Sequence, residues 1–262
     1  MTYRTHILLG CALSCLSSWG HAATVTLVDP ATLSGTAVVD FEDLNLGLGA
    51  TVNYDGEFES GTVQFSAGFV GQTIGVSGFF DTVSGSPSGP LALFDDAANQ
   101  NILAVDGGDG NFGNTSIAGL GPLGFPTANA IGEGVISVLF DFDQSEFGFD
   151  LIGGDGGTAT LQFFGRDGSL LTEITTNPLF GTLMLGFATD DTSKSIAGVT
   201  ILNSDPGGVG VDNVRSDVRG VIGPPPVGPR PEIVPLPAGI LLLGSGLLAL
   251  GAARRESRRR AR

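Results

Sequence analysis

Apolar and polar residues alternate with a period of two along much of this chain, and the apolar runs are short. In the stretch "EFGFDLIG", Phe147, Phe149 and Leu151 fall on one face and the residues between them on the other. Such alternation predicts a β-strand with one face in a core and the other outside it. The 3.6-residue period of an amphipathic helix is nearly absent between residues 23 and 221.

Ten apolar runs rich in β-branched and aromatic residues are predicted strands, because clusters of Gly, Asp, Asn and Ser separate them. They cover residues 24–29, 36–41, 62–66, 91–95, 135–143, 146–153, 158–165, 169–175, 182–188 and 197–203. Residues 166–169, Arg-Asp-Gly-Ser, have the composition of a tight hairpin turn. The pattern therefore predicts one all-β domain over residues 23–222, an antiparallel β-sandwich or jelly roll.

The first 22 residues read as a secretory signal peptide. Arg4 supplies the positive charge, residues 7–16 form a short apolar core, and Gly20-His21-Ala22 is a small-x-small cleavage site. We expect signal peptidase to cut between Ala22 and Ala23 after export through the Sec machinery. A membrane anchor is the alternative, but the apolar run is much shorter than the roughly 20 residues that span a bilayer.

Cleavage at this site leaves a mature chain with little reactive chemistry. Both cysteines, Cys11 and Cys15, leave with the signal, as do both histidines and Trp19. Each cysteine lies in a weak lipoprotein-like box, so lipidation is the alternative there. Without Cys or His, the mature chain has no disulfide, no thiolate nucleophile and no His- or Cys-bound zinc.

Charge separates the exported region from the C-terminus. Residues 23–233 contain 26 acidic and five basic residues, a formal charge of −21. A surface of this sign repels phosphate backbones, which excludes nucleic acid as a partner. Divalent cations and uncharged partners such as sugars stay compatible with it.

The C-terminus is organised as a membrane segment. Residues 223–233 are proline-rich and predict an extended linker. The 21 residues from 233 to 253 carry no charge, and the predicted transmembrane helix covers 239–253. The arginines that follow should stop transfer and remain cytoplasmic by the positive-inside rule. The stop-transfer residues are Arg254, Arg255, Arg258, Arg259 and Arg260.

The same tail resembles the PEP-CTERM sorting tails of Gram-negative bacteria, in the variant whose motif is Val234-Pro235-Leu236-Pro237-Ala238. Residues 234–262 have the motif, the apolar helix and the arginine cluster in the order typical of that class. The resemblance implies recognition by an exosortase, a transpeptidase-like membrane enzyme. It also implies a periplasmic-side anchor in the inner membrane before processing, and the cell surface or the medium afterwards. Val234-Pro235 is followed by Leu236 rather than Glu, so the variant enzyme should process it.

Two short segments near the ends of the predicted domain, "VVDFEDL" (38–44) and "GVGVDNVRS" (208–216), are similar to the first and last strands of jelly-roll carbohydrate-binding modules. The resemblance implies that these strands are neighbours and that their acidic residues hold a structural calcium ion. The candidate ligands are Glu42, Asp43, Asp212 and Asn213. A single copy of a calcium β-roll nonapeptide at 207–215 and an oxygen-rich loop at 106–114 read more simply as a turn and a solvated loop.

Three functions fit these observations. The first is a non-catalytic surface or extracellular-matrix protein, sorted by its tail, with polysaccharide as the candidate ligand. The second is a calcium-stabilised structural or adhesin-like protein without a sugar site. The third is a glycan hydrolase, for which Asp141, Asp143 and Glu146 are close enough in sequence to act as a carboxylate pair. The first is our expectation, because carboxylates this close are common by chance in so acidic a chain.

Overall fold

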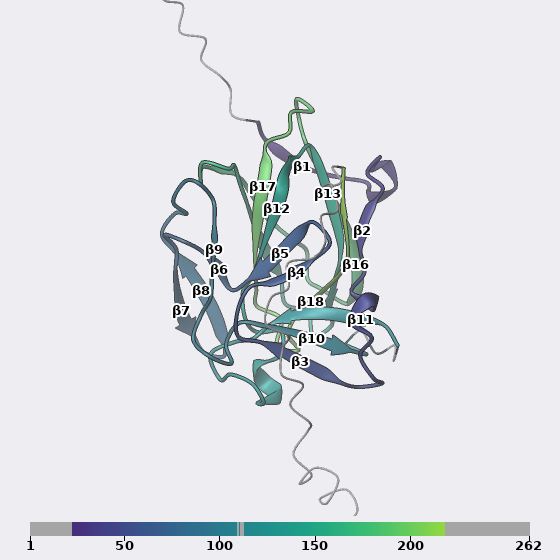
Figure 1. Ribbon diagram of the computed structural model, residues 1–262, viewed down its shortest axis with the longest axis vertical. Coiled ribbons are helices and arrows are strands. Elements are labelled where there is room, and N and C mark those ends of the chain that lie inside the picture. The colour runs from purple at the N-terminus through teal and green to yellow at the C-terminus, as the bar shows by residue number, and fades with distance from the viewer. Residues whose placement is uncertain (1–22, 109, 111–112, 218–262) are drawn as a thin grey trace, which may run out of the picture.

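The computed structural model describes residues 23–108, 110 and 113–217 (Figure 1). In these residues the chain forms antiparallel strands and three short 3-10 helices, which confirms the predicted all-β class. The predicted signal peptide, linker, sorting motif, transmembrane helix and arginine cluster lie outside the described residues. Among the described residues, no helix is both long enough and apolar enough to cross a membrane.

Two sheets form the body of the domain. The larger sheet has the order β1, β16, β13, β18, β11, β10, β3, with β2 also beside β18. Its strands are β1 (Val25–Val28), β2 (Ala37–Val39), β3 (Thr51–Tyr54), β10 (Ile102–Asp106), β11 (Thr115–Gly119), β13 (Glu146–Gly153), β16 (Gly181–Thr189) and β18 (Gly210–Ser216).

The smaller sheet has the order β15, β14, β17, β12, β5, β4. Its strands are β4 (Phe58–Ser60), β5 (Val63–Ser66), β12 (Ile136–Gln144), β14 (Ala159–Phe164), β15 (Leu170–Thr175) and β17 (Ile196–Asn203). The predicted hairpin is present, since β14 and β15 pair antiparallel across Arg166–Ser169. Three 3-10 helices connect strands: η1 (Pro30–Thr32), η2 (Glu42–Leu44) and η3 (Ala128–Ala130).

Phenylalanine fills the space between the two sheets. Phe147 on β13 meets Phe140 on β12 with ring centroids 4.9 Å apart. Phe187 on β16 meets Phe163 on β14 at 4.8 Å. All four rings are fully buried. Since aromatic residues bury the largest area per side chain, these contacts between sheets hold the sandwich closed.

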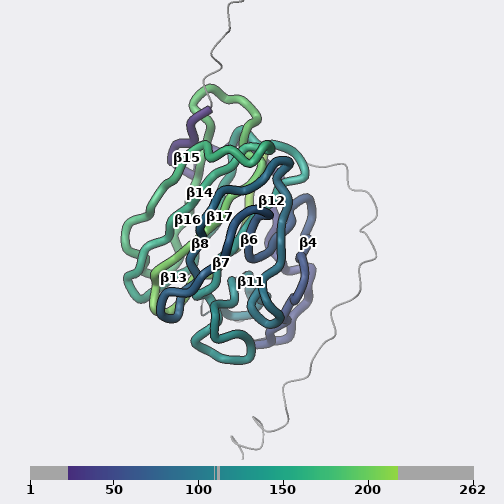
Figure 2. Tube along the Cα trace, turned by 90° about the vertical axis from the view of Figure 1, so that its left-hand side faces the viewer, coloured from purple at the N-terminus to yellow at the C-terminus, as the bar shows by residue number. Residues whose placement is uncertain are grey.

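A third layer covers the outer face of the smaller sheet. The segment between residues 67 and 96 forms the short pair β6 (Gly68–Phe69) and β9 (Leu93–Phe94) and the hairpin β7 (Thr73–Ser77) and β8 (Phe80–Ser84). In Figure 2 this segment lies in front of β12 and β17. A second apolar cluster, which includes Phe69, Leu139 and Phe164, is buried beneath it. On the larger sheet, by contrast, the outward side chain of Met184 is 58% exposed, so that face is open to solvent there.

The two ends of the described domain lie at one pole. Ser145, just before β13, binds the carboxylate of Asp217 through both its N–H and its hydroxyl. Thr189 at the end of β16 donates its N–H to the carbonyl of Ser145, and Asp190 donates to the carbonyl of Thr24. The opposite pole holds the other ends of β13, β16 and β18, where the candidate site lies.

Candidate functional site

A hollow of about 330 Å³ opens on the outer face of the larger sheet. Five adjacent strands, β10, β11, β18, β13 and β16, contribute to it, together with the loops at their ends. The lining residues are Val105, Gly108, Ser116, Ala118, Ile131, Gly132, Ile152, Gly153, Gly154, Asp155, Gly181, Thr182, Gly207, Gly208, Val209 and Gly210.

The hollow exists because half of its lining residues are glycine and leave the backbone bare. Two of them also let loops cross closely. Gly132 and Gly208 have φ of +96° and +76°. A Cβ on Gly132 would lie 2.6 Å from the nitrogen of Val209, so a side chain does not fit there. Gly210 differs, because a Cβ there would point toward Ser116 Oγ at an ordinary 3.6 Å.

Three polar side chains face the hollow. Ser116 on β11 is only 1% exposed, and its Oγ has no hydrogen-bond partner among the described residues. A buried hydroxyl without a partner costs free energy, so a ligand or water that satisfies it is favoured. Thr182 and Asp155 lie on the exposed side of the hollow.

The loops around the hollow are fixed by one buried carboxylate. Asp205 is fully buried and accepts hydrogen bonds from the N–H groups of Asp155, Gly157 and Gly207 at 2.9 to 3.2 Å. Three such bonds distribute the negative charge over backbone donors. These bonds hold the wall of the hollow in place.

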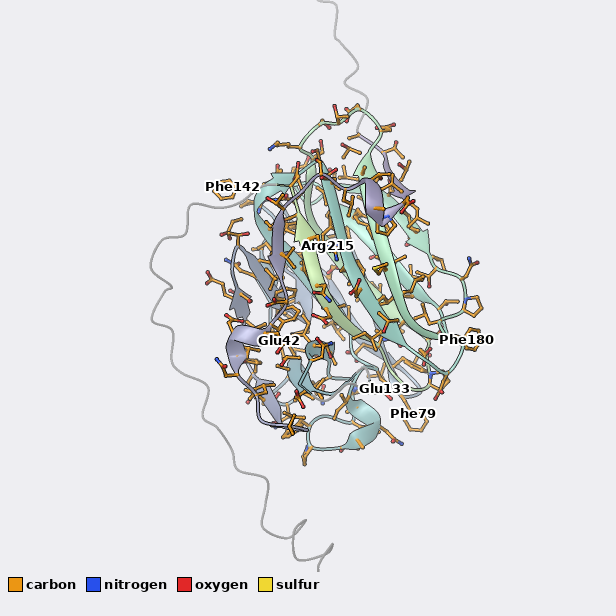
Figure 3. All side chains as sticks on the ribbon, turned by 90° about the vertical axis from the view of Figure 1, so that its right-hand side faces the viewer. Glu42, Phe79, Glu133, Phe142, Phe180 and Arg215 are labelled. Carbon is orange, nitrogen blue, oxygen red and sulfur yellow. The ribbon has the colours of Figure 1, made fainter. Side chains whose placement is uncertain are left out.

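An aromatic ring stands beside the hollow. Phe180 directly precedes the lining residue Gly181 and is 78% exposed. Its ring edge lies 3.2 Å from the position that a Cβ on Gly156 would take, so it rests on bare backbone. In Figure 3, Phe180 projects from the same side of the molecule as Glu133 and Phe79, whereas Phe142 lies on the opposite side.

The four predicted calcium ligands divide into two groups. β2 pairs with β18, as the resemblance implied, with Val39 opposite Val214. Glu42 follows β2 and accepts a hydrogen bond from the N–H of Thr115. Asp212 and Asn213 lie on β18, and Asn213 also donates to Asp150 of β13. The fourth residue, Asp43, lies near Tyr54 instead, whose pKa is raised to about 12 by burial and, secondarily, by the Asp43 charge.

Asp212 is the most buried of these groups, at 2% exposure. Its pKa is raised to about 6, chiefly by burial and to a smaller extent by the charges of Asp150 and Glu42, while hydrogen bonds from Asn114 and Asn213 oppose the rise. Carboxylates from three parts of the chain thus converge here. Among the described residues, however, no three His, Cys, Asp or Glu side chains are grouped closely enough to hold a metal ion by themselves.

The three carboxylates considered for hydrolysis have structural partners. Asp143 forms an ion pair with Arg166 at 2.7 Å. Asp141 accepts from Gln64, and Glu146 accepts from Ser34 and from the N–H of Gly35. Glu146 begins β13 and Gly153 of the hollow ends it, so the two are about 23 Å apart at 3.3 Å per residue. Sequence proximity did not place these acids near the hollow.

Comparison with known proteins adds little. No protein-family model matches the chain, and no curated protein sequence matches it. Among solved structures, a mutant of the carbohydrate-binding module CBM29-2 matches with a TM-score of 0.26 and 12% identity, over 74% of this chain and 91% of the module. A second CBM29-2 mutant, solved with mannohexaose, has a TM-score of 0.27 and 11% identity with the same coverage.

The enzymatically active domain of bacteriophage CBA120 tailspike protein 4 also matches, with a TM-score of 0.25 and 13% identity, over 62% of this chain and 21% of that one. TM-scores this low establish neither a shared fold nor a shared ligand. The candidate function therefore has to be argued from the hollow itself.

Proposed function

We propose that this protein is an exported, non-catalytic polysaccharide-binding protein whose ligand lies in the hollow of the larger sheet. The observation that carries the proposal is a trough across five adjacent strands that combines a buried, unpartnered hydroxyl with an exposed aromatic ring at its side. Neighbouring strands lie about 4.8 Å apart, so four spacings give a length of about 19 Å. That length suits a chain of sugars better than a single ring.

The ligand should be uncharged. Ser116, Thr182 and Asp155 offer hydroxyl and carboxylate oxygens, and none of the described residues that line the hollow is Lys or Arg. Sugar hydroxyls can donate to these acceptors, and the apolar face of a sugar ring can stack on Phe180. A polyuronate or a phosphorylated polymer would meet Asp155 and the strongly negative domain without a compensating cation.

Filling the hollow should abolish binding. Gly210→Val places a branched side chain over Ser116, where the backbone tolerates a Cβ. We expect the full chain to bind at least one of a panel of neutral polysaccharides in affinity electrophoresis, and the variant to show no retardation. Gly47→Val is the matched control, because nothing lies within 4 Å of a Cβ at Gly47. Equal binding by Gly210→Val and wild type would refute the site.

A second proposal concerns calcium. The convergence of Glu42, Asp150 and Asp212 supports it, since carboxylate oxygens are the ligands that calcium prefers and a cation would offset their repulsion. The fit is partial, because these carboxylates accept hydrogen bonds from Thr115, Asn114 and Asn213 and would need carbonyl or amide oxygens to complete the coordination. A bound ion would join η2, β13 and β18. This would stabilise the domain whether or not the hollow binds a sugar.

Sorting by an exosortase is a third part of the proposal, and it rests on residues 234–262 alone. Replacing Pro235 and Pro237 by alanine should leave export through the Sec machinery intact but prevent processing of the tail, because the substituted residues would no longer interrupt a helix. The measurement is electrophoretic mobility and cell fractionation of the exported protein. Unchanged mobility and location in the double variant would count against a sorting role.

A further inference from the structure

The β7–β8 hairpin is joined to the wall of the hollow through Asp81. The N–H of Asp81 donates to the carbonyl of Glu133 at 3.1 Å. In return, the N–H of Val135 donates to the side-chain Oδ2 of Asp81 at 3.2 Å. The residue before this segment, Gly132, lines the hollow and contacts Gly208 and Val209. The segment 133–135 thus bonds to the hairpin and directly follows a residue that lines the hollow.

Residues 133–135 are closely packed against neighbouring backbone. A Cβ on Gly134 would lie 2.4 Å from backbone atoms of Leu120, and one on Gly121 would lie 3.0 Å from both Glu133 Cβ and the carbonyl of Phe79. Phe79 is at the tip of the hairpin, so Gly121 lies between the tip and Glu133. The hairpin tip, Gly121 and the segment 133–135 are therefore packed in direct contact.

Two carboxyl groups are buried in this joint, and no described basic side chain forms an ion pair with either. Asp81 and Glu133 are each 5% exposed, and Oε2 of Glu133 has no hydrogen-bond partner in the part of the chain that the structure describes. The ion pair found among the described residues, Arg166 with Asp143, lies elsewhere. The charged groups that act on them are acids, Asp96 on Asp81 and Asp205 on Glu133. Burial, as the largest cause, raises the pKa of Asp81 and of Glu133 to about 7.

We infer that Asp81 and Glu133 form a proton-dependent latch, which holds the β7–β8 hairpin against the wall of the hollow when the two carboxyls are neutral and loosens it when they ionise. A neutral carboxyl is tolerated in a buried joint and can donate a hydrogen bond. An ionised carboxylate in the same place has lost its hydration and lies near another acid, and both effects cost free energy. If the latch controls ligand binding, that role rests on the proposed function. The latch itself does not depend on the proposed function.

The direction of the pH dependence follows from proton linkage. In the unfolded chain these groups titrate near 3.9 and 4.3, well below their values in the fold. Between about pH 4 and pH 7 the folded protein therefore holds more protons than the unfolded chain. Stability must fall as pH rises through that window, and these two groups add no further slope above it.

The test compares the full chain with Asp81→Asn, Glu133→Gln and the double variant at pH 5 and pH 8. We expect the melting temperature of the wild type to fall by several degrees more than that of the double variant. Glu173→Gln, an exposed acid on β15, is the matched control and should behave as the wild type. An equal fall in the wild type and the double variant overturns the latch.

A measurement on the wild type guards against variants that do not fold. Carboxyl carbon resonances should show Asp81 and Glu133 titrating near neutral pH, with faster amide exchange at Asp81 and Val135, after correction for intrinsic rates, at the same midpoint. Titration near pH 4, or unchanged protection of those amides, refutes the latch. Neither readout needs a sugar, so failure of the polysaccharide proposal would be seen separately, in affinity electrophoresis.

Discussion

Phe180→Ala is expected to weaken polysaccharide binding on the order of thirtyfold, about 2 kcal/mol, because an exposed aromatic anchor often dominates an interface. Its melting temperature should stay at the wild-type value, since the side chain is 78% exposed and supports no core contact. Affinity electrophoresis and thermal unfolding of the full chain measure the two quantities. Loss of binding without loss of stability is the signature of a contact residue.

Two other phenylalanines provide controls for this prediction. Phe142, 47% exposed on the opposite side of the molecule, should lose neither binding nor stability when replaced by alanine. Phe187 is fully buried, and Phe187→Ala should cost about 3–5 kcal/mol of folding free energy. If Phe142→Ala weakened binding as much as Phe180→Ala, the ligand would not be held at the hollow.

Calcium is expected to raise the melting temperature of the full chain by several degrees at millimolar concentration. A ligand that binds only the folded state stabilises it by about 2.7 kcal/mol at a hundredfold excess over Kd. Asp212→Ala should lose most of this rise, because Asp212 lies between Asp150 and Glu42. Thermal unfolding with calcium and with a chelator measures the effect.

The matched control for this experiment is Asp141→Ala, an exposed acid on β12, which belongs to the smaller sheet, whereas Asp212 lies on β18 of the larger one. It should keep the full calcium response. An equal rise in wild type and Asp212→Ala would indicate diffuse screening of the negative surface rather than a site. No rise in melting temperature at all would show that calcium does not stabilise the domain.

The sequence predicted strands best where burial alternates. β13 spans the predicted residues 146–153, and its buried Phe147, Phe149 and Leu151 face inward as expected. β11 was missed because Thr115–Gly119 contains mostly small residues, although all five are buried. β10 was missed because its apolar residues do not alternate with polar ones. The β7–β8 hairpin was missed because its glycines and serines resemble a loop.

The candidate site could be predicted less well than the fold. Its walls come from residues that have no side chain, such as Gly132 and Gly210, and from strands that are far apart in sequence. No local pattern encodes a missing side chain at the meeting of five strands. Ser116 and Asp205 were also missed, because a single Ser or Asp carries no signal of burial. The pairing of β2 with β18 was expected, but only from the resemblance of two short segments.

The position of the chain ends gives the hollow an orientation. Asp217 lies at the pole marked by Ser145 and Thr189, whereas Gly153, Gly181 and Gly210 lie at the other ends of the same strands. A tether that continues from Asp217 would therefore place the hollow away from the point of attachment, about 23 Å along β13 at 3.3 Å per residue, with the hollow still opening on the outer face of the larger sheet. Molecules side by side on a surface would then hold their hollows at one height above it, so that one polymer chain could bind several neighbours at once and dissociate far more slowly than from a single site.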